Sequence, residues 1–180
     1  MRFVVSFLIS LCLCACRPSA VAPETGTASR SAPVVQIPLD PNAICSALNE
    51  AGLVGSRWKE GAAGFGCVSP ELALGPREPG TSVSSSVWFE VRGTEATSAT
   101  TIVLGGDVRV PEAESAVRNK LASLATLLVK KLNLTLDNTL PAAIQSNAPY
   151  EKRIGDFAVR YHSEMVGKVR EDRLTIQRAL

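Results

Sequence analysis

Residues 85–93 read SSVWFEVRG, and apolar side chains alternate with polar ones along this stretch. The alternation places Val87, Phe89 and Val91 on one side of an extended chain and Trp88 on the other. A period of two is typical of a β-strand with one buried face. This stretch therefore predicts a sheet with a core on one side and an aromatic side chain on the opposite side.

The next apolar segment, TTIVLGGDVRV at residues 100–110, predicts a second strand. The turn residues GTEATS at 93–98 separate the two strands, so we expect an antiparallel hairpin. Gly105 and Gly106 lie inside the second strand, and such a pair indicates a bulge or bend. Asp107 is then expected to be a bulge or turn residue.

The strongest helical pattern covers residues 111–133. Glu112 lies near the predicted N-terminus and Lys131 near the C-terminus, as the helix dipole favours. A second, short helix is predicted at 138–146. The apolar positions that fall on one face of the long helix, and that we expect to pack on the sheet, are Val117, Leu121, Leu124, Leu128 and Leu132.

A short N-terminal helix is predicted to begin at Asp40 as its N-cap, with Pro41 as its first helical residue, and to end before Gly52. Together these elements predict an α+β domain at 40–180. It has a mostly antiparallel sheet of four to five strands, the long helix across one face and the short N-terminal helix. The remaining predicted strands lie at 65–68, 157–161 and 174–176.

The chain start is a separate segment. Residues 1–15 have a short basic head followed by an apolar run, which is typical of an export signal. The run is shorter than the about 20 apolar residues that a membrane-spanning helix needs. We therefore predict a signal peptide at 1–15, with a buried core helix as the alternative.

The end of this run is Leu13-Cys14-Ala15-Cys16, which resembles the lipobox of bacterial lipoprotein precursors. The resemblance implies that Cys16 becomes the lipidated N-terminus. Cys14 departs from the alanine, serine or threonine usual at its position. Arg17 follows the anchor instead of aspartate, which by the enterobacterial sorting rule favours an outer-membrane lipoprotein facing the periplasm. The alternative is ordinary signal cleavage near Ala20 or Ala22, which gives a soluble periplasmic protein.

Residues 16–39 are rich in Pro, Ser, Thr, Ala and Gly and show neither a helical nor a strand period. This composition predicts a disordered tether between the anchor and the domain.

Cys45 and Cys67 are the only cysteines after the signal and Cys16. In an oxidising exported context such a pair predicts a disulfide, here between the first helix and the first strand. A metal site would need more ligands than one histidine and two cysteines provide, and the C-x-x-C spacing of a redox pair is absent. We expect no metal and no cofactor.

His162 is the only histidine and no nucleophile-elbow motif accompanies it, so it is a weak catalytic candidate. Trp88 and Trp58 are candidate interface residues, because exposed tryptophans are typical anchors at protein interfaces. The net charge of +2 and the aromatic content of 5% give no basic patch or stacking surface for nucleic acid. The charged residues of the C-terminal part, among them Asp172, are expected to form a solvated face.

From these features we expect a membrane-anchored lipoprotein that is not an enzyme and binds a protein partner in the envelope, for example as an accessory of a secretion or conjugation apparatus. Two alternatives stay open. One is a periplasmic hydrolase or cell-wall enzyme that uses His162, and the other is a structural envelope protein without catalysis.

Overall fold

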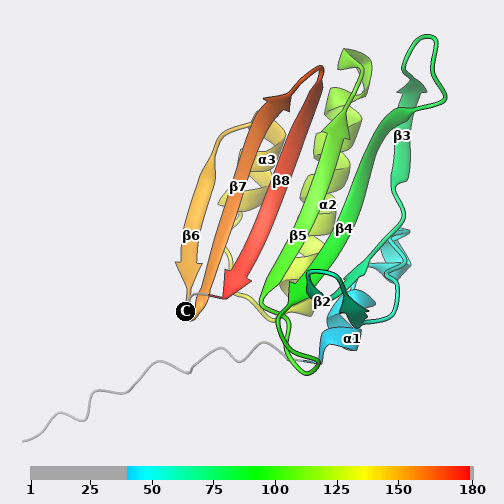
Figure 1. Ribbon diagram of the computed structural model, residues 1–180. Coiled ribbons are helices and arrows are strands. Elements are labelled where there is room, and N and C mark those ends of the chain that lie inside the picture. Colours follow the sequence, from blue (N-terminus) through cyan, green and yellow to red (C-terminus); the bar gives the residue numbers. More distant parts are fainter. Residues whose placement is uncertain (1–39, 179–180) are drawn as a thin grey trace, which may run out of the picture. The chain divides into compact units, whose positions relative to one another are not determined.

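The computed structural model describes residues 40–178 (Figure 1). The predicted signal peptide at 1–15, Cys16 and the tether at 16–39 lie outside these residues. The described residues belong to one compact unit of the chain.

The centre of the fold is one antiparallel sheet, seen in Figure 1 with the helices behind it. Strands β4 (Ser84–Gly93) and β5 (Thr101–Val108) form the predicted hairpin. Strand β8 (Val169–Arg178) pairs with β5 and with β7 (Phe157–Val166), so the C-terminal hairpin joins the first one through β8.

The prediction of four to five strands is wrong, because the sheet has eight strands in the order β1-β2-β4-β5-β8-β7-β6, with β3 paired to β4. Strand β2 (Gly64–Val68) lies where it was expected. The three strands that the sequence did not predict are β1 (Lys59–Gly61), β3 (Leu72–Arg77) and β6 (Tyr150–Ile154).

Each unpredicted strand lies at or near an edge of the sheet and lacks a clear hydrophobic alternation. Strand β1 has three residues, all exposed. Strand β3 contains Gly75 and Pro76, and its register with β4 shifts between Leu74 and Arg77. Proline is tolerated at such an edge because its missing N–H leaves no inner ladder bond unmade.

The predicted bulge at Gly105 and Gly106 is also absent, since β4 and β5 keep one continuous register through both residues. The glycines instead leave room on the two faces of the sheet. A Cβ at Gly106 would lie 2.7 Å from Val117 Cγ1 of the long helix, and a Cβ at Gly105 would lie 2.2 Å from Trp88 Cε2.

Helix α2 (Glu114–Lys131) follows a 3-10 turn at Pro111–Ala113 and packs along the sheet with Val117, Leu121 and Leu128 fully buried. Helix α3 (Thr139–Ser146) lies on the same side and buries Leu140 and Ile144. Apolar burial between this helix layer and the sheet provides the core.

The predicted N-terminal helix is shorter than expected. Helix α1 (Pro41–Cys45) ends early, and a separate 3-10 turn follows at Asn49–Ala51. The N-cap is confirmed, because the backbone N–H of Asn42 donates to Asp40 Oδ1 at 3.0 Å. Gly52, with φ 93°, ends this segment as predicted.

Candidate functional site

Helices α2 and α3 cover one face of the sheet (Figure 1). No helix in residues 40–178 covers the other face, which we call the open face. Trp88 lies on the open face, because its neighbours Val87 and Phe89 are fully buried on the helix side. Its side chain is half-buried. The candidate interface residue therefore lies on the one broad surface of the sheet that no described helix protects.

The position of the Trp88 ring depends on Gly105. A Cβ at Gly105 would meet three atoms of the indole, Cε2, Cζ2 and Nε1, at 2.2 to 2.7 Å. Any other residue at this position would therefore displace the ring. The strand register places a row of neighbouring residues across the open face. This row consists of Trp88, Gly105, Arg173 of β8 and His162 of β7.

The adjacent row of the open face is acidic. It runs from Ser86 through Asp107 and Glu171 to Glu164. Ser86 is buried and donates a hydrogen bond to Glu71 Oε2 at 2.8 Å, which brings another carboxylate to this end of the face.

Asp107 lies in the most perturbed environment of this row. Desolvation is the main cause that raises the pKa of Asp107, and the charges of Glu171 and Glu71 add to it. The polar Trp88 indole and the charge of Arg109 lower the pKa of Asp107 and so act in the opposite direction. Asp107 lies inside β5 and pairs with Ser86 in the continuous register, so it is not the bulge or turn residue that the sequence predicted.

His162 is half-exposed on the open face, and its Nε2 lies 3.8 Å from Glu164 Oε1. In the described part of the chain, its imidazole makes no hydrogen bond to a serine, threonine or cysteine. The weak catalytic candidate therefore lacks the base–nucleophile contact that a hydrolase of this kind requires.

Trp58 occupies a different kind of place. Its ring stacks on Phe65 with centroids 6.2 Å apart, and its indole N–H donates to the backbone oxygen of Ala96 at 2.9 Å. The ring also packs against the core and against Gly93. These contacts fix the loop at the end of the β4–β5 hairpin, so of the two tryptophans Trp88 is the better interface candidate.

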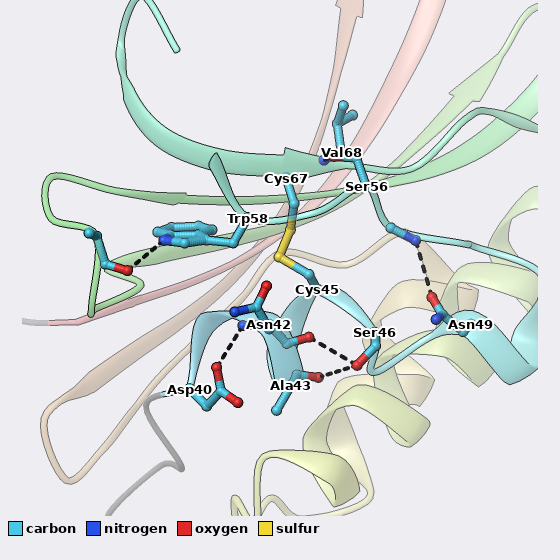
Figure 2. The surroundings of a disulfide bond; sticks show 12 residues. Asp40, Asn42, Ala43, Cys45, Ser46, Asn49, Ser56, Trp58, Cys67 and Val68 are labelled. Carbon is cyan, nitrogen blue, oxygen red and sulfur yellow. Dashed lines mark hydrogen bonds between the residues drawn. A yellow bond between two sulfur atoms is a disulfide. The ribbon is translucent and has the colours of Figure 1, made fainter. Parts of the chain in front are cut away.

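The predicted disulfide between Cys45 and Cys67 is present, and it joins the end of α1 to β2 (Figure 2). Both residues are buried. Nearby, the Val68 amide donates to Ser56 Oγ at 3.1 Å and the Gly55 amide to Asn49 Oδ1 at 3.1 Å. The bond therefore connects the N-terminal segment to the edge of the sheet.

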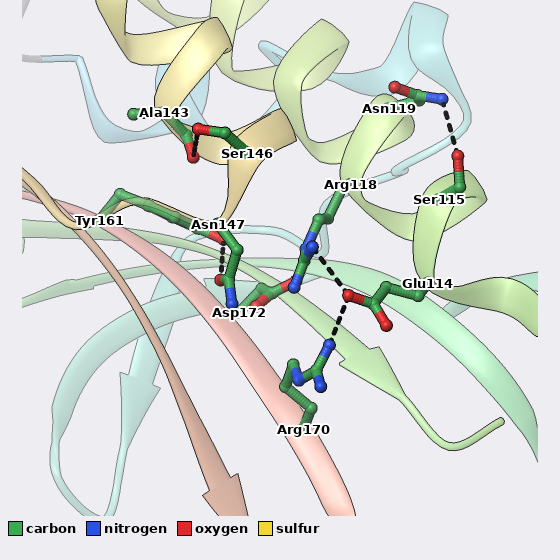
Figure 3. A network of polar contacts seen from close by, with 10 residues as sticks. All are labelled: Glu114, Ser115, Arg118, Asn119, Ala143, Ser146, Asn147, Tyr161, Arg170 and Asp172. Atoms are coloured by element: carbon green, nitrogen blue, oxygen red, sulfur yellow. Dashed lines mark hydrogen bonds and ion pairs between the residues drawn. The ribbon is translucent and has the colours of Figure 1, made fainter. Parts of the chain in front are cut away.

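A buried polar network on the helix side of the sheet was not predicted (Figure 3). Asp172 of β8 is fully buried, and Arg118 Nε of α2 lies 3.5 Å from its Oδ2. Glu114 pairs with Arg118 at 2.7 Å and with Arg170 at 2.5 Å. The prediction that Asp172 belongs to a solvated face is therefore wrong.

Tyr161 of β7 lies in the same network and donates to Asn147 Oδ1 at 3.2 Å. Burial raises the pKa of Tyr161 well above its usual value, and the charge of Asp172 adds to this effect. The period-two pattern contained the missed signal, because Asp172 stands two and four positions before the inward-facing Leu174 and Ile176.

Two further observations concern residues 40–178 only. They contain no group of three or more His, Cys, Asp or Glu residues placed to hold a metal ion. None of the helices formed by these residues is long and apolar enough to cross a membrane.

A family model described as "Family of unknown function (DUF6030)" matches residues 14–174. No curated protein and no solved structure matches the chain significantly.

Proposed function

The chain belongs to the DUF6030 family, whose function is unknown, so we propose a function from the features of the chain itself. The protein is a membrane-anchored lipoprotein of the bacterial envelope that acts as a binding or assembly module for a protein partner. The partner docks on the open face, with Trp88 as the central contact.

The observation that carries this proposal is the placement of Trp88 on the open face, across Gly105. Tryptophan contributes a large rigid contact area, and it is among the residues whose truncation costs most at interfaces. A glycine in a strand weakens that strand, so its presence at 105 fits a requirement for the ring to lie there.

The anchor rests on the lipobox-like Leu13-Cys14-Ala15-Cys16, which lies within the family match except for Leu13. Metabolic labelling with a palmitate analogue should mark the wild-type protein and not the Cys16→Ser variant. Equal labelling of both would exclude Cys16 as the anchor. If the protein is instead cleaved near Ala20 or Ala22, the mature chain is soluble and unlabelled.

Partner docking is tested by photo-cross-linking in cells that produce the full-length protein. A benzoylphenylalanine replaces Thr175 on the open face or, as the matched control, Ser123 on the exposed side of α2. We expect a discrete protein adduct from position 175 and none from position 123. Trp88→Ala should abolish the adduct from position 175 while the circular dichroism spectrum is retained.

The proposal fails if both positions give the same adducts, if neither gives one, or if the adduct from position 175 is indifferent to Trp88→Ala. The same cells test the enzyme alternative. A folded His162→Ala variant that loses the phenotype of the wild-type gene would favour a hydrolase over a binding module.

A further inference from the structure

The carboxylates of the open face gather at one end of it. Glu71, Asp107, Glu164 and Glu171 are brought there by the register of β4, β5, β8 and β7 and by the hydrogen bond from Ser86 to Glu71. We call these four residues the acidic end of the open face. Trp88 lies in the row next to it.

Most carboxylates of the acidic end lack a cationic partner among the described residues. Among residues 40–178, only Glu171 of the four has an arginine or lysine at ion-pair distance, namely Arg173. Glu164 has only the imidazole of His162, 3.8 Å away, which is charged only when protonated. A partly buried carboxylate without a cationic partner is an unfavourable arrangement in an isolated domain.

Asp107 shows this deficit most clearly. It is partly desolvated, it faces the negative charges of Glu171 and Glu71, and the nearby Arg109 does not outweigh these effects. A cation bound beside Asp107 would offset both the repulsion and the cost of desolvation. The opposite end of the open face differs, because there Glu90 pairs with Arg92 at 2.6 Å and Glu151 with Arg160 at 2.8 Å.

Trp88 adds a second means of holding a cation. Its ring lies across Gly105, and its side chain is only half-buried. Lysine and arginine side chains bind to the faces of tryptophan rings, at about 0.5–1 kcal/mol at exposed sites. An aromatic face with carboxylates beside it is complementary to a basic side chain.

The spacing favours a peptide segment over a single ion. Asp107, Glu171 and Glu164 stand on three adjacent strands, about 4.8 Å apart from one strand to the next. The absence of a metal-holding group among the described residues agrees with this spread. Alternate side chains of an extended segment are about 6.6 Å apart, so such a segment can present several cations to this row.

This inference rests on the proposed function and specifies the chemistry of the partner: we infer that the acidic end of the open face and Trp88 receive a lysine- or arginine-rich segment of the partner protein. The segment pairs its cations with Asp107 and its neighbours and lays one of them on the Trp88 ring.

The test is isothermal titration calorimetry of the full-length protein in detergent micelles. The probes are a short peptide of alternating lysine and serine and the matched peptide of alternating glutamate and serine. We expect binding of the lysine peptide only, and loss of that binding in roughly 1 M salt, where the Debye length is about 3 Å.

Asp107→Asn keeps the shape of the side chain and removes the charge. It should weaken binding of the lysine peptide about threefold or more. Glu151→Gln, at the opposite end of the same face, is the matched control and should leave the affinity unchanged.

The inference is overturned if the lysine peptide does not bind, if both peptides bind equally, or if Asp107→Asn and Glu151→Gln have the same effect. Cross-linking from position 175 that depends on Trp88, combined with no binding of the lysine peptide, would leave the proposed function standing and remove only the inferred chemistry of the partner.

Discussion

The buried ion pair between Arg118 and Asp172 allows a quantitative prediction for the variant Arg118→Met. Asp172 has no exposed side-chain surface, Arg118 retains 12%, and Nε lies 3.5 Å from Oδ2. At an effective dielectric constant of about 20, two unit charges at this distance attract by about 5 kcal/mol. The substitution removes this attraction and leaves Asp172 buried without its counter-charge. We therefore expect the free energy of unfolding to fall by about 3–5 kcal/mol.

The measurement is urea unfolding followed by far-ultraviolet circular dichroism. The double variant Arg118→Met with Asp172→Leu removes both charges and should recover most of the loss, because an apolar pair fits a buried site without a desolvation cost. The control Arg92→Met breaks a shorter ion pair, 2.6 Å, whose arginine is 63% exposed, and should cost less than about 1 kcal/mol. A loss as small in Arg118→Met as in the control, or a double variant that shows the sum of the single losses, would refute this reasoning.

Three further predictions concern stability and the site. Reduction of the disulfide, which closes a loop with a sequence separation of 22, should lower the free energy of unfolding by about 3 kcal/mol and the Tm by about 10 °C, measured by thermal unfolding with and without reductant. The raised pKa of Tyr161 means that the folded state holds this proton more tightly than the unfolded state. Its contribution to the free energy of unfolding is therefore complete below the ordinary pKa of 10.0 and is lost as the pH rises above that value. Tyr161→Phe should flatten this alkaline decline, measured by urea unfolding at pH 9 to 11. Gly105→Ala should displace the Trp88 ring and shift the indole fluorescence, whereas Gly61→Ala, where a Cβ meets nothing closer than 3.6 Å, should leave the fluorescence unchanged.

The central part of the fold could be predicted because its signals are local. The alternation around Phe89 places β4, the leucine pattern places α2, and Asp40 with its following proline places the start of α1. In each case the neighbouring residues determine the element without reference to distant parts of the chain. The pairing of Cys45 with Cys67 followed from their number and from the predicted export of the chain.

The remaining strands could not be predicted because they depend on their partners. Residues 72–77 contain glycine and proline, and they become a strand only because Leu72 and Leu74 reach the core beside β4. Residues 150–154 carry three charges and gain their order from β7. In both segments tertiary pairing overrides a weak local preference.

The site shows the same division. The side of the sheet to which Trp88 belongs followed from alternation, but its contact with Gly105 depends on the register between two strands, which the sequence does not specify. Asp172 was missed because the charges around it suggested a solvated face and the predicted strand began at residue 174, whereas the structure begins β8 at Val169. Because the predicted strand began too late, the only fully buried carboxylate in residues 40–178 was assigned to the surface.

On each face of the sheet a glycine of β5 makes room for a neighbouring side chain, and the two positions differ in what covers that side chain. Gly106 admits Val117 of α2, so the space it leaves is filled by the core and contributes to apolar burial. Gly105 admits Trp88 on the face without a helix, where the ring is only half-buried. A glycine in a strand costs about 0.5–1 kcal/mol relative to alanine. At 106 helix packing offsets this cost, but at 105 the described chain supplies only the half-buried Trp88 ring. A partner that covers Trp88 would supply the missing burial, which is why the open face, and not the helix layer, is the surface on which binding should be tested first.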